Sequence, residues 1–180
     1  MAIISGELQR MAQEENKMRN TIAPFFEPKS IAIIGSFRET WFGGYICLKH
    51  LLTFGFSGKI YPVSPFYSEV LDMQVYPSIK EMPEAVDLAV IITPSQIVPQ
   101  IIKECAEKGV KAVIIVSDGF AERDEKGAKL QQEVVDIAKR ASIRILGPNT
   151  VGTANIATGL VTTPYATRYE KIKRGAVAFC

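Results

Sequence analysis

The sequence has few of the residues that metal or covalent chemistry requires. It holds one histidine and three cysteines among 180 residues. Cys47, Cys105 and Cys180 are widely spaced and form no CxxC pair, which argues against a disulfide framework and a zinc site. His50 falls within a predicted helix, where we expect a solvated or partly packed side chain. The sequence therefore indicates no metal cluster and no pair of nucleophile and base.

A strong charge of one sign and a long hydrophobic run are also missing. Lysine and arginine total 21 and aspartate and glutamate 19, a formal net charge of +2, so no basic field favours nucleic acid. No apolar run approaches a bilayer span, and the charged N-terminal segment does not resemble a signal peptide. We therefore expect a cytoplasmic protein, in a reducing compartment, that binds neither nucleic acid nor membrane.

The composition fits one globular domain with short additions. Apolar residues make up 47% of the chain and charged residues 22%, enough for one buried core. Apolar residues three and four positions apart predict an amphipathic helix over 1–23, packed as an appendage. We expect the main domain over 24–165. Residues 166–180 are expected to form a linker and the first strand of a second domain whose remainder is missing.

The middle of the chain alternates between short Ile- and Val-rich runs and helical periodicities. This alternation predicts an α/β protein with a Rossmann-like, doubly wound, mostly parallel sheet. The predicted strands cover 30–35, 59–64, a short stretch near Val75, 87–93, 111–117 and 143–146. The predicted helices cover 45–54, 96–108 and 122–141.

Five loops at the carboxyl ends of these strands are candidates for a ligand site, because ligands of open parallel sheets bind there. The first strand runs into loop 35–44, where backbone N–H groups, a helix N-terminus and Arg38 could face a phosphate. This loop is not a GxGxxG motif, and its glycines could equally serve to turn the chain.

The second strand ends at Val63, Ser64 and Pro65, without the acid that holds the ribose in a typical NAD-binding fold. The small Ser64 hydroxyl suits an adenosine whose ribose is not bound by a carboxylate, including one that carries a phosphate. A plain turn at the end of a strand fits the same residues.

The other three strand ends are turns of small polar residues, each compatible with a ligand site or with an ordinary turn. Thr93 and Pro94 matter most, because we expect their strand beside the first, across from Gly35 and Ser36. Asp118 could be a binding carboxylate. The remaining residues of these turns are Ser95, Ser117, Gly119, Phe120, Gly147, Pro148, Asn149 and Thr150.

Taken in order, these motifs resemble the CoA-binding domain of NDP-forming acyl-CoA synthetases, which include ADP-forming acetate–CoA ligase and the succinyl-CoA ligase α subunit. The resemblance covers about residues 24–165, and the following GLVTTPY and GAVAF resemble the crossing into the family's second domain. Six blocks occur in the family's order: FFEPKSIAIIGSFRE, GGYICLKHLL, GKIYPVSP, YPSIKEMPEAVDLAVIITP, CAEKGVKAVIIVSDGFAE and IRILGPNTVG.

The resemblance implies that the chain supplies the CoA pocket of a larger ligase. Such a ligase converts an acid, ATP and CoA into acyl-CoA, ADP and phosphate. Its phosphohistidine and ATP-grasp domains, absent from this chain, are the implied partners, so we expect the chain alone to be inactive. For the CoA phosphates and adenosine the resemblance implies Gly35, Ser36, Arg38, Ser64 and Pro65. For the pantetheine arm and thiol it implies Thr93, Pro94, Ser117, Asp118, Gly119 and Asn149.

Three aromatic residues depart from the family's pattern. Phe37 and Trp41 are bulky additions to the first loop, and Phe66 stands where a basic residue is often found. These residues reduce the affinity for phosphate, or they stack on adenine in compensation. Two other functions remain open: a sensor module that binds NAD(H), and a scaffold that has lost its ligand. The turn at Ser64, which lacks an acid, argues against NAD(H).

Overall fold

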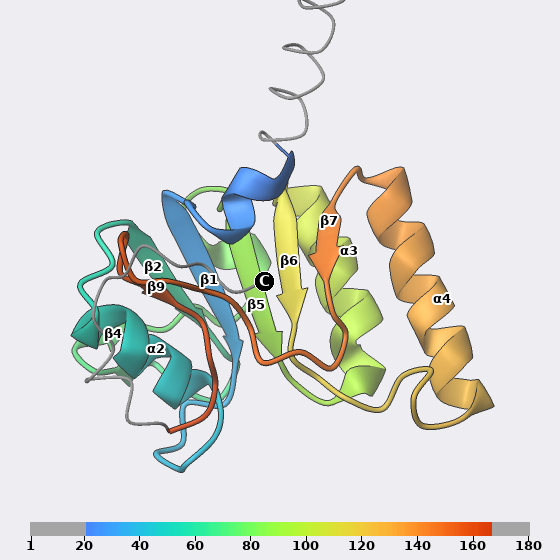
Figure 1. Cartoon of the computed structure of the whole chain (residues 1–180), viewed down its shortest axis with the longest axis horizontal. Coiled ribbons are helices and arrows are strands. Elements are labelled where there is room, and N and C mark those ends of the chain that lie inside the picture. The colour runs from blue at the N-terminus through green and yellow to red at the C-terminus, as the bar shows by residue number, and fades with distance from the viewer. Residues whose placement is uncertain (1–20, 167–180) are drawn as a thin grey trace, which may run out of the picture.

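The computed structural model describes residues 21–166, and its centre is a five-stranded parallel sheet (Figure 1). The strand order is β2-β1-β5-β6-β7. This order confirms the predicted Rossmann-like α/β fold. Each predicted strand of the sheet begins and ends within two residues of the observed strand. The strands are β1 (Ser30–Gly35), β2 (Lys59–Val63), β5 (Leu88–Ile92), β6 (Ala112–Ile115) and β7 (Arg144–Leu146).

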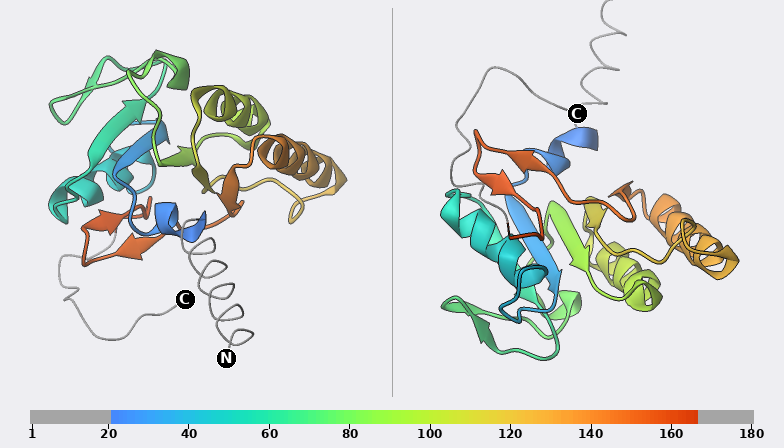
Figure 2. Two further views of the ribbon diagram at one scale, coloured as in Figure 1. Left: turned by 90° about the horizontal axis from the view of Figure 1, so that it is seen from above. Right: turned by 60° about the horizontal axis from the view of Figure 1, so that its bottom comes forward.

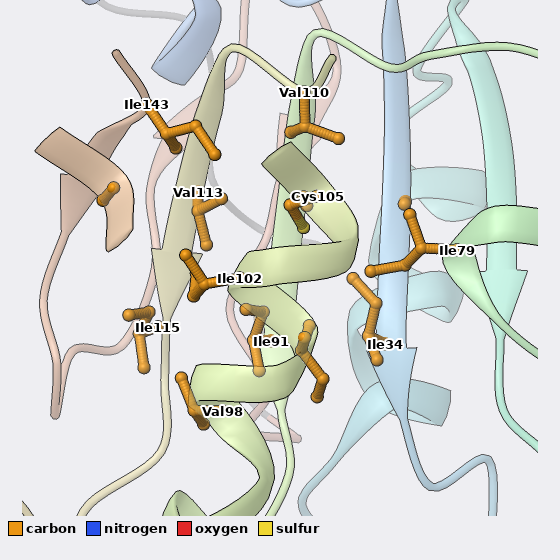
Figure 3. Packing of buried hydrophobic residues seen from close by; sticks show 14 of the residues in the cluster. Ile34, Ile79, Ile91, Val98, Ile102, Cys105, Val110, Val113, Ile115 and Ile143 are labelled. Atoms are coloured by element: carbon orange, nitrogen blue, oxygen red, sulfur yellow. The ribbon is translucent and has the colours of Figure 1, made fainter. Parts of the chain in front are cut away.

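Helices cover both faces of the sheet, as a doubly wound fold requires (Figures 1 and 2). Helix α2 (Gly44–Thr53) lies on one face, and α3 (Val98–Lys108) and α4 (Glu125–Arg140) lie on the other. Figure 3 shows how Val98, Ile102 and Cys105 of α3 pack against apolar side chains of β5 and β6. Since both faces are covered, the central strands are almost wholly apolar.

The helix ends follow from local sequence. Gly109 has φ +84° directly after α3, the left-handed conformation that a glycine at this position permits. The side chain of Asp124 accepts a hydrogen bond from the backbone N–H of Gly127 at 2.8 Å and begins α4. The predicted start of this helix at residue 122 is therefore wrong by three residues, because the Asp124 cap fixes the start.

A short strand forms near Val75, as predicted, but it lies outside the main sheet. Strands β3 (Glu69–Val70) and β4 (Met73–Gln74) form an antiparallel hairpin outside the main sheet. Tyr76 connects this segment to the end of β2 through an isolated bridge to Val63 and backbone hydrogen bonds with Pro62 and Ser64. The hairpin leads to the short 3-10 helix η2 (Ile79–Glu81) at the edge of the apolar layer under α3.

The last described residues return to the face that carries α2. Strands β8 (Ala154–Asn155) and β9 (Leu160–Val161) form a hairpin there, beside the 3-10 helix η1 (Ala23–Phe25), as Figure 2 shows. His50 in α2 is buried, and its Nδ1 lies 3.0 Å from the Thr163 carbonyl oxygen. The expected solvated or partly packed histidine is thus a buried one that joins α2 to the C-terminal segment.

Two expectations lie largely or wholly outside the described residues. These are the N-terminal helix, apart from residues 21–23, and the linker and strand over 166–180, apart from residue 166. Among residues 21–166, no helix is both long enough and apolar enough to cross a membrane.

Candidate ligand-binding site

The site lies where β1 and β5 run side by side and their connections leave toward opposite faces. Gly35, the last residue of β1, is in register with Ile92, the last residue of β5. The chain then continues to α2 on one face and, through the 3-10 helix η3 (Ser95–Ile97), to α3 on the other. This divergence opens a crevice at the carboxyl ends of the strands. Thr93 and Pro94 lie beside Gly35, as predicted.

A first cavity of about 460 Å³ opens on the α3 side of this crevice. Its walls come from the ends of β1, β2 and β5, from the segment before η2, and from one face of α3. It is largely apolar, with Ile34, Val63, Ile79 and Ile92 from the core. The rest of its lining is Gly35, Ser36, Ser64, Pro65, Phe66, Pro77, Ser78, Thr93, Pro94, Ile97, Gln100, Ile101 and Glu104.

A second cavity of about 440 Å³ lies on the other side of Thr93 and Pro94. It shares Ile92, Thr93 and Pro94 with the first cavity, so these residues form a ridge between the two. Both volumes are in the range of ordinary small-molecule sites, roughly 300–1,000 Å³. The remaining lining residues are Phe42, Val116, Ser117, Asp118, Asn149 and Tyr165.

The structure brings nine of the eleven predicted site residues to these two cavities. Gly119 and Arg38 line neither of them. Arg38 is exposed in the loop that follows β1, next to Ser36. The first cavity holds Gly35, Ser36, Ser64 and Pro65, the second holds Ser117, Asp118 and Asn149, and Thr93 and Pro94 line both.

The loop after β1 is held by Ser36. Its Oγ accepts a hydrogen bond from the Arg38 backbone N–H at 3.3 Å and lies 3.2 Å from the Tyr67 hydroxyl. These contacts fix the start of the loop at the mouth of the first cavity. The Arg38 side chain stays exposed, where a guanidinium can reach an anionic group of a ligand.

Ser117 joins three strand ends around the second cavity. Its Oγ accepts a hydrogen bond from the Thr93 backbone N–H at 3.3 Å, and its carbonyl oxygen accepts one from the Asn149 N–H at 2.9 Å. Asn149 has φ +55°, a left-handed conformation that asparagine tolerates better than most residues. Ser117 is buried, so its hydroxyl stabilises the wall of the cavity.

The turn after β6 is stabilised by its own carboxylate. Glu122 accepts hydrogen bonds from the backbone N–H groups of Gly119 at 2.7 Å and Phe120 at 3.1 Å. Desolvation raises the pKa of Glu122, but hydrogen bonds from backbone N–H groups outweigh it and hold the pKa below its usual range. Because Glu122 occupies the Gly119 N–H, that group is not open to a ligand in this conformation.

The three unusual aromatic residues have different environments. Phe37 is buried and packs edge-on against Tyr67, with ring centroids 5.9 Å apart. The suggestion that Phe37 stacks on adenine is therefore wrong, because its ring belongs to the core. Trp41 is 70% exposed and lies 5.9 Å from the ring of Tyr165. Phe66 is 85% exposed and lines the first cavity, so its ring is available to a ligand.

Several lining residues were missed from the sequence. Ile97, Gln100, Ile101 and Glu104 follow Thr93 at helical spacing, and one face of the following helix could have been predicted as a wall of the site. No pattern in the sequence indicated that Tyr165 lines the second cavity. Its approach to Phe42, at 4.9 Å between ring centroids, depends on the return of the chain after β9.

The described residues give no indication of metal or thiol chemistry. Within 21–166, no three His, Cys, Asp or Glu side chains gather as they would to hold a metal ion. Cys47 and Cys105 are buried, as predicted, and desolvation raises the pKa of both thiols, to about 12 for Cys105. Protonated, enclosed thiols of this kind are inert.

Fold and site together define a Rossmann-like α/β domain with two ligand-sized cavities at the carboxyl ends of its strands. Residues 29–155 match the family model described as the CoA binding domain. The chain belongs to this family. Together with the related proteins described next, this match confirms the resemblance to the CoA-binding part of ADP-forming acyl-CoA synthetases and favours it over an NAD(H)-binding sensor.

Related proteins cover the same stretch of the chain. ADP-forming acetate–CoA ligase II of Archaeoglobus fulgidus is 43% identical over 161 residues, 89% of this chain and 23% of that protein. The α subunit of ADP-forming acetate–CoA ligase I of Pyrococcus furiosus is 43% identical over 136 residues, 73% of this chain and 29% of the subunit. The chain thus spans less than a third of the length of either relative.

A solved structure agrees with the fold. The apo form of the dinucleotide-forming acetyl-coenzyme A synthetase 1 of Ca. Korarchaeum cryptofilum is 34% identical, with a TM-score of 0.75. The match covers 79% of this chain and 31% of that chain. The similarity therefore concerns one domain of a larger protein.

Proposed function

We propose that this chain is the CoA-binding module of an ADP-forming acyl-CoA synthetase. The adenosine end of CoA occupies the first cavity, and the pantetheine arm crosses the Thr93–Pro94 ridge toward the second cavity. The observation that carries this proposal is the pair of cavities of similar size on either side of that ridge. An elongated ligand with a compact base at one end and a thin arm at the other fits such a pair.

The phosphates of CoA lie at the mouth of the first cavity, beside Gly35, Ser36 and Arg38. None of the described residues that line either cavity is a lysine or an arginine, so the charged groups have no partner inside. Exposed Arg38 supplies a cation next to Ser36 at this rim. A charge-assisted hydrogen bond from a guanidinium to phosphate is one of the stronger polar interactions in proteins.

The chemical steps require other domains or another subunit. In the proposed reaction an acid, ATP and CoA give acyl-CoA, ADP and phosphate, with a histidine that carries the phosphoryl group. The one histidine of this sequence, His50, is buried beneath Thr163 and has no exposed imidazole to phosphorylate. The chain therefore supplies the CoA site, and its partners are the parts that hold ATP, the acid and the phosphohistidine.

Calorimetric titration of CoA and NADH into the purified chain at one moderate salt concentration tests the proposal. We expect micromolar binding of CoA and no binding of NADH. Arg38→Ala should weaken CoA binding, whereas Arg144→Ala removes the same charge from the amino-terminal end of β7 and should leave it unchanged. Binding of NADH alone would favour the sensor function, and binding of neither ligand would favour the scaffold. Either result would overturn the proposal.

A further inference from the structure

The first cavity contains one charged side chain, and that charge is negative. Among its described lining residues Glu104 is the only acid, and there is no base. Glu104 is half-buried on α3. Lys80 pairs with Glu107 at 2.7 Å and also interacts electrostatically with Glu104. A ligand in this cavity therefore meets one carboxylate, and no lysine or arginine among the described lining residues.

Glu104 lies far from the rim where the phosphates are proposed to bind. Ile97, Gln100 and Glu104 share one face of η3 and α3, and this helix runs away from the carboxyl ends of the strands. With a rise of about 1.5 Å per residue, Glu104 lies roughly 10 Å beyond Ile97 along the axis. It can contact the end of the ligand that is most distant from the phosphates.

Gln100 completes a pair of hydrogen-bond acceptors. Its Nε2 donates to Glu104 Oε1 at 3.0 Å, which fixes the orientation of both side chains. This leaves the Gln100 amide oxygen and the second Glu104 oxygen as acceptors. The cavity therefore offers a hydrogen-bond donor of the ligand two acceptors at this point, beside apolar walls formed by Ile79 and Ile101. Figure 3 shows Ile79 beside α3.

We propose that Glu104 and Gln100 select adenine by accepting hydrogen bonds from its 6-amino group. This inference rests on the proposed CoA-binding function and names the residues that read the base. Adenine presents two N–H donors at this position, whereas hypoxanthine and guanine present a carbonyl acceptor that the Glu104 carboxylate would repel. Because Glu104 is partly buried and Gln100 is exposed, a base without this donor loses about one hydrogen bond relative to adenine.

The ribose of CoA is a less suitable partner for Glu104. It carries a 3′-phosphate, and a carboxylate next to that phosphate would place two negative charges together. With the base against Glu104, the ribose and its phosphate lie nearer to the rim and to Arg38. The location of the single carboxylate therefore orients the nucleotide with its base at the end of the cavity farthest from the phosphates.

The test compares CoA with 1,N6-etheno-CoA, in which the 6-amino nitrogen has lost both hydrogens. We expect the wild-type chain to bind the etheno analogue about tenfold more weakly than CoA, the effect of about one charge-assisted hydrogen bond. Glu104→Gln removes the charge but keeps one acceptor oxygen, so it should bring this ratio of dissociation constants closer to one. Glu125→Gln removes the same charge at the exposed start of α4 and should keep the wild-type ratio.

The ratio is measured on one protein preparation at a time, so partial unfolding of a variant affects both ligands equally. Equal affinity of the wild type for CoA and the analogue would overturn the inference and leave the proposed function intact. If Glu104→Gln binds both ligands more weakly and the ratio is unchanged, Glu104 contacts the ribose and not the base. That result would also overturn the inference. Absence of CoA binding to the wild type would instead refute the proposed function.

Discussion

Gly35 and Ile92 lie so close at the ends of β1 and β5 that a Cβ on Gly35 would stand 2.5 Å from the Ile92 carbonyl oxygen. Only a residue without a side chain fits against a backbone at that distance. Both cavities open from this contact, since Ile92 belongs to the ridge between them. The close approach of the two strand ends thus sets the geometry of the site.

Gly35→Ala should therefore lower both stability and CoA affinity. Forcing a methyl group against the β5 backbone costs roughly 1–3 kcal/mol, and the displaced strand ends change the mouth of the first cavity. Thermal unfolding and CoA titration of the variant measure the two effects. Gly55→Ala is the control, because its Cβ meets no atom within 4 Å and only the φ of +70° is unfavourable. It should lose stability but keep its CoA affinity. The same affinity in both variants would refute the role of Gly35.

Phe66→Ala should weaken CoA binding without changing stability. The ring is 85% exposed and lines the first cavity, so its removal costs the fold little while the adenine loses a stacking surface. Stacking of a base on an aromatic side chain contributes about 1–3 kcal/mol, which predicts a loss of about five- to 150-fold in affinity. Leu52→Ala, an exposed apolar residue of α2 outside both cavities, should leave binding unchanged. An unaltered dissociation constant for Phe66→Ala would remove Phe66 from the site.

Glu122→Gln should destabilise the chain at neutral pH and lose this effect in acid. The folded pKa of Glu122 lies below its unfolded value because backbone N–H groups bind the carboxylate. Its stabilisation is therefore fully present above the unfolded pKa of about 4.3, and it is lost as the pH falls toward the lower folded pKa. Melting temperatures of wild type and variant should differ at pH 7 and converge as the pH falls through the lowered pKa of Glu122.

The same substitution at exposed Glu27 serves as the control for Glu122 and should give no difference at any pH. A gap between wild type and Glu122→Gln that stays constant down to the acid range would show that the carboxylate charge does not hold the turn after β6.

Ser117→Ala should lower the free energy of unfolding by about 1 kcal/mol, because the Thr93 N–H loses its acceptor beneath the ridge. Denaturant unfolding measures the loss. The same substitution at exposed Ser68 is expected to have no effect. If Ser117→Ala unfolds at the wild-type midpoint, the hydrogen bond to Thr93 does not stabilise the wall between the strand ends.

The order of strands and helices could be predicted from the sequence because each depends on short-range patterns. Ile- and Val-rich runs with helices between them predict a covered parallel sheet. Gly109 marks the end of α3 through its freedom to adopt a positive φ. The positions of Thr93 and Pro94 beside Gly35 followed from the expectation that their strand lies next to the first one. The predicted start of α4 was wrong because acidic residues at a helix start do not show which of them caps the helix. Asp124 is the cap, and Glu122 binds the turn before it.

The sequence by itself thus determined the fold class, the family and the loops of the candidate site, since each depends on patterns among residues close in sequence. Only the tertiary structure decided what those loops enclose. The burial of Phe37 and His50, the approach of Tyr165 to Phe42, and the carboxylate of Glu104 inside the first cavity all depend on segments distant in sequence. Such contacts arise when the crossovers pack on the two faces of the sheet, and no local pattern specifies which side chains then face one another.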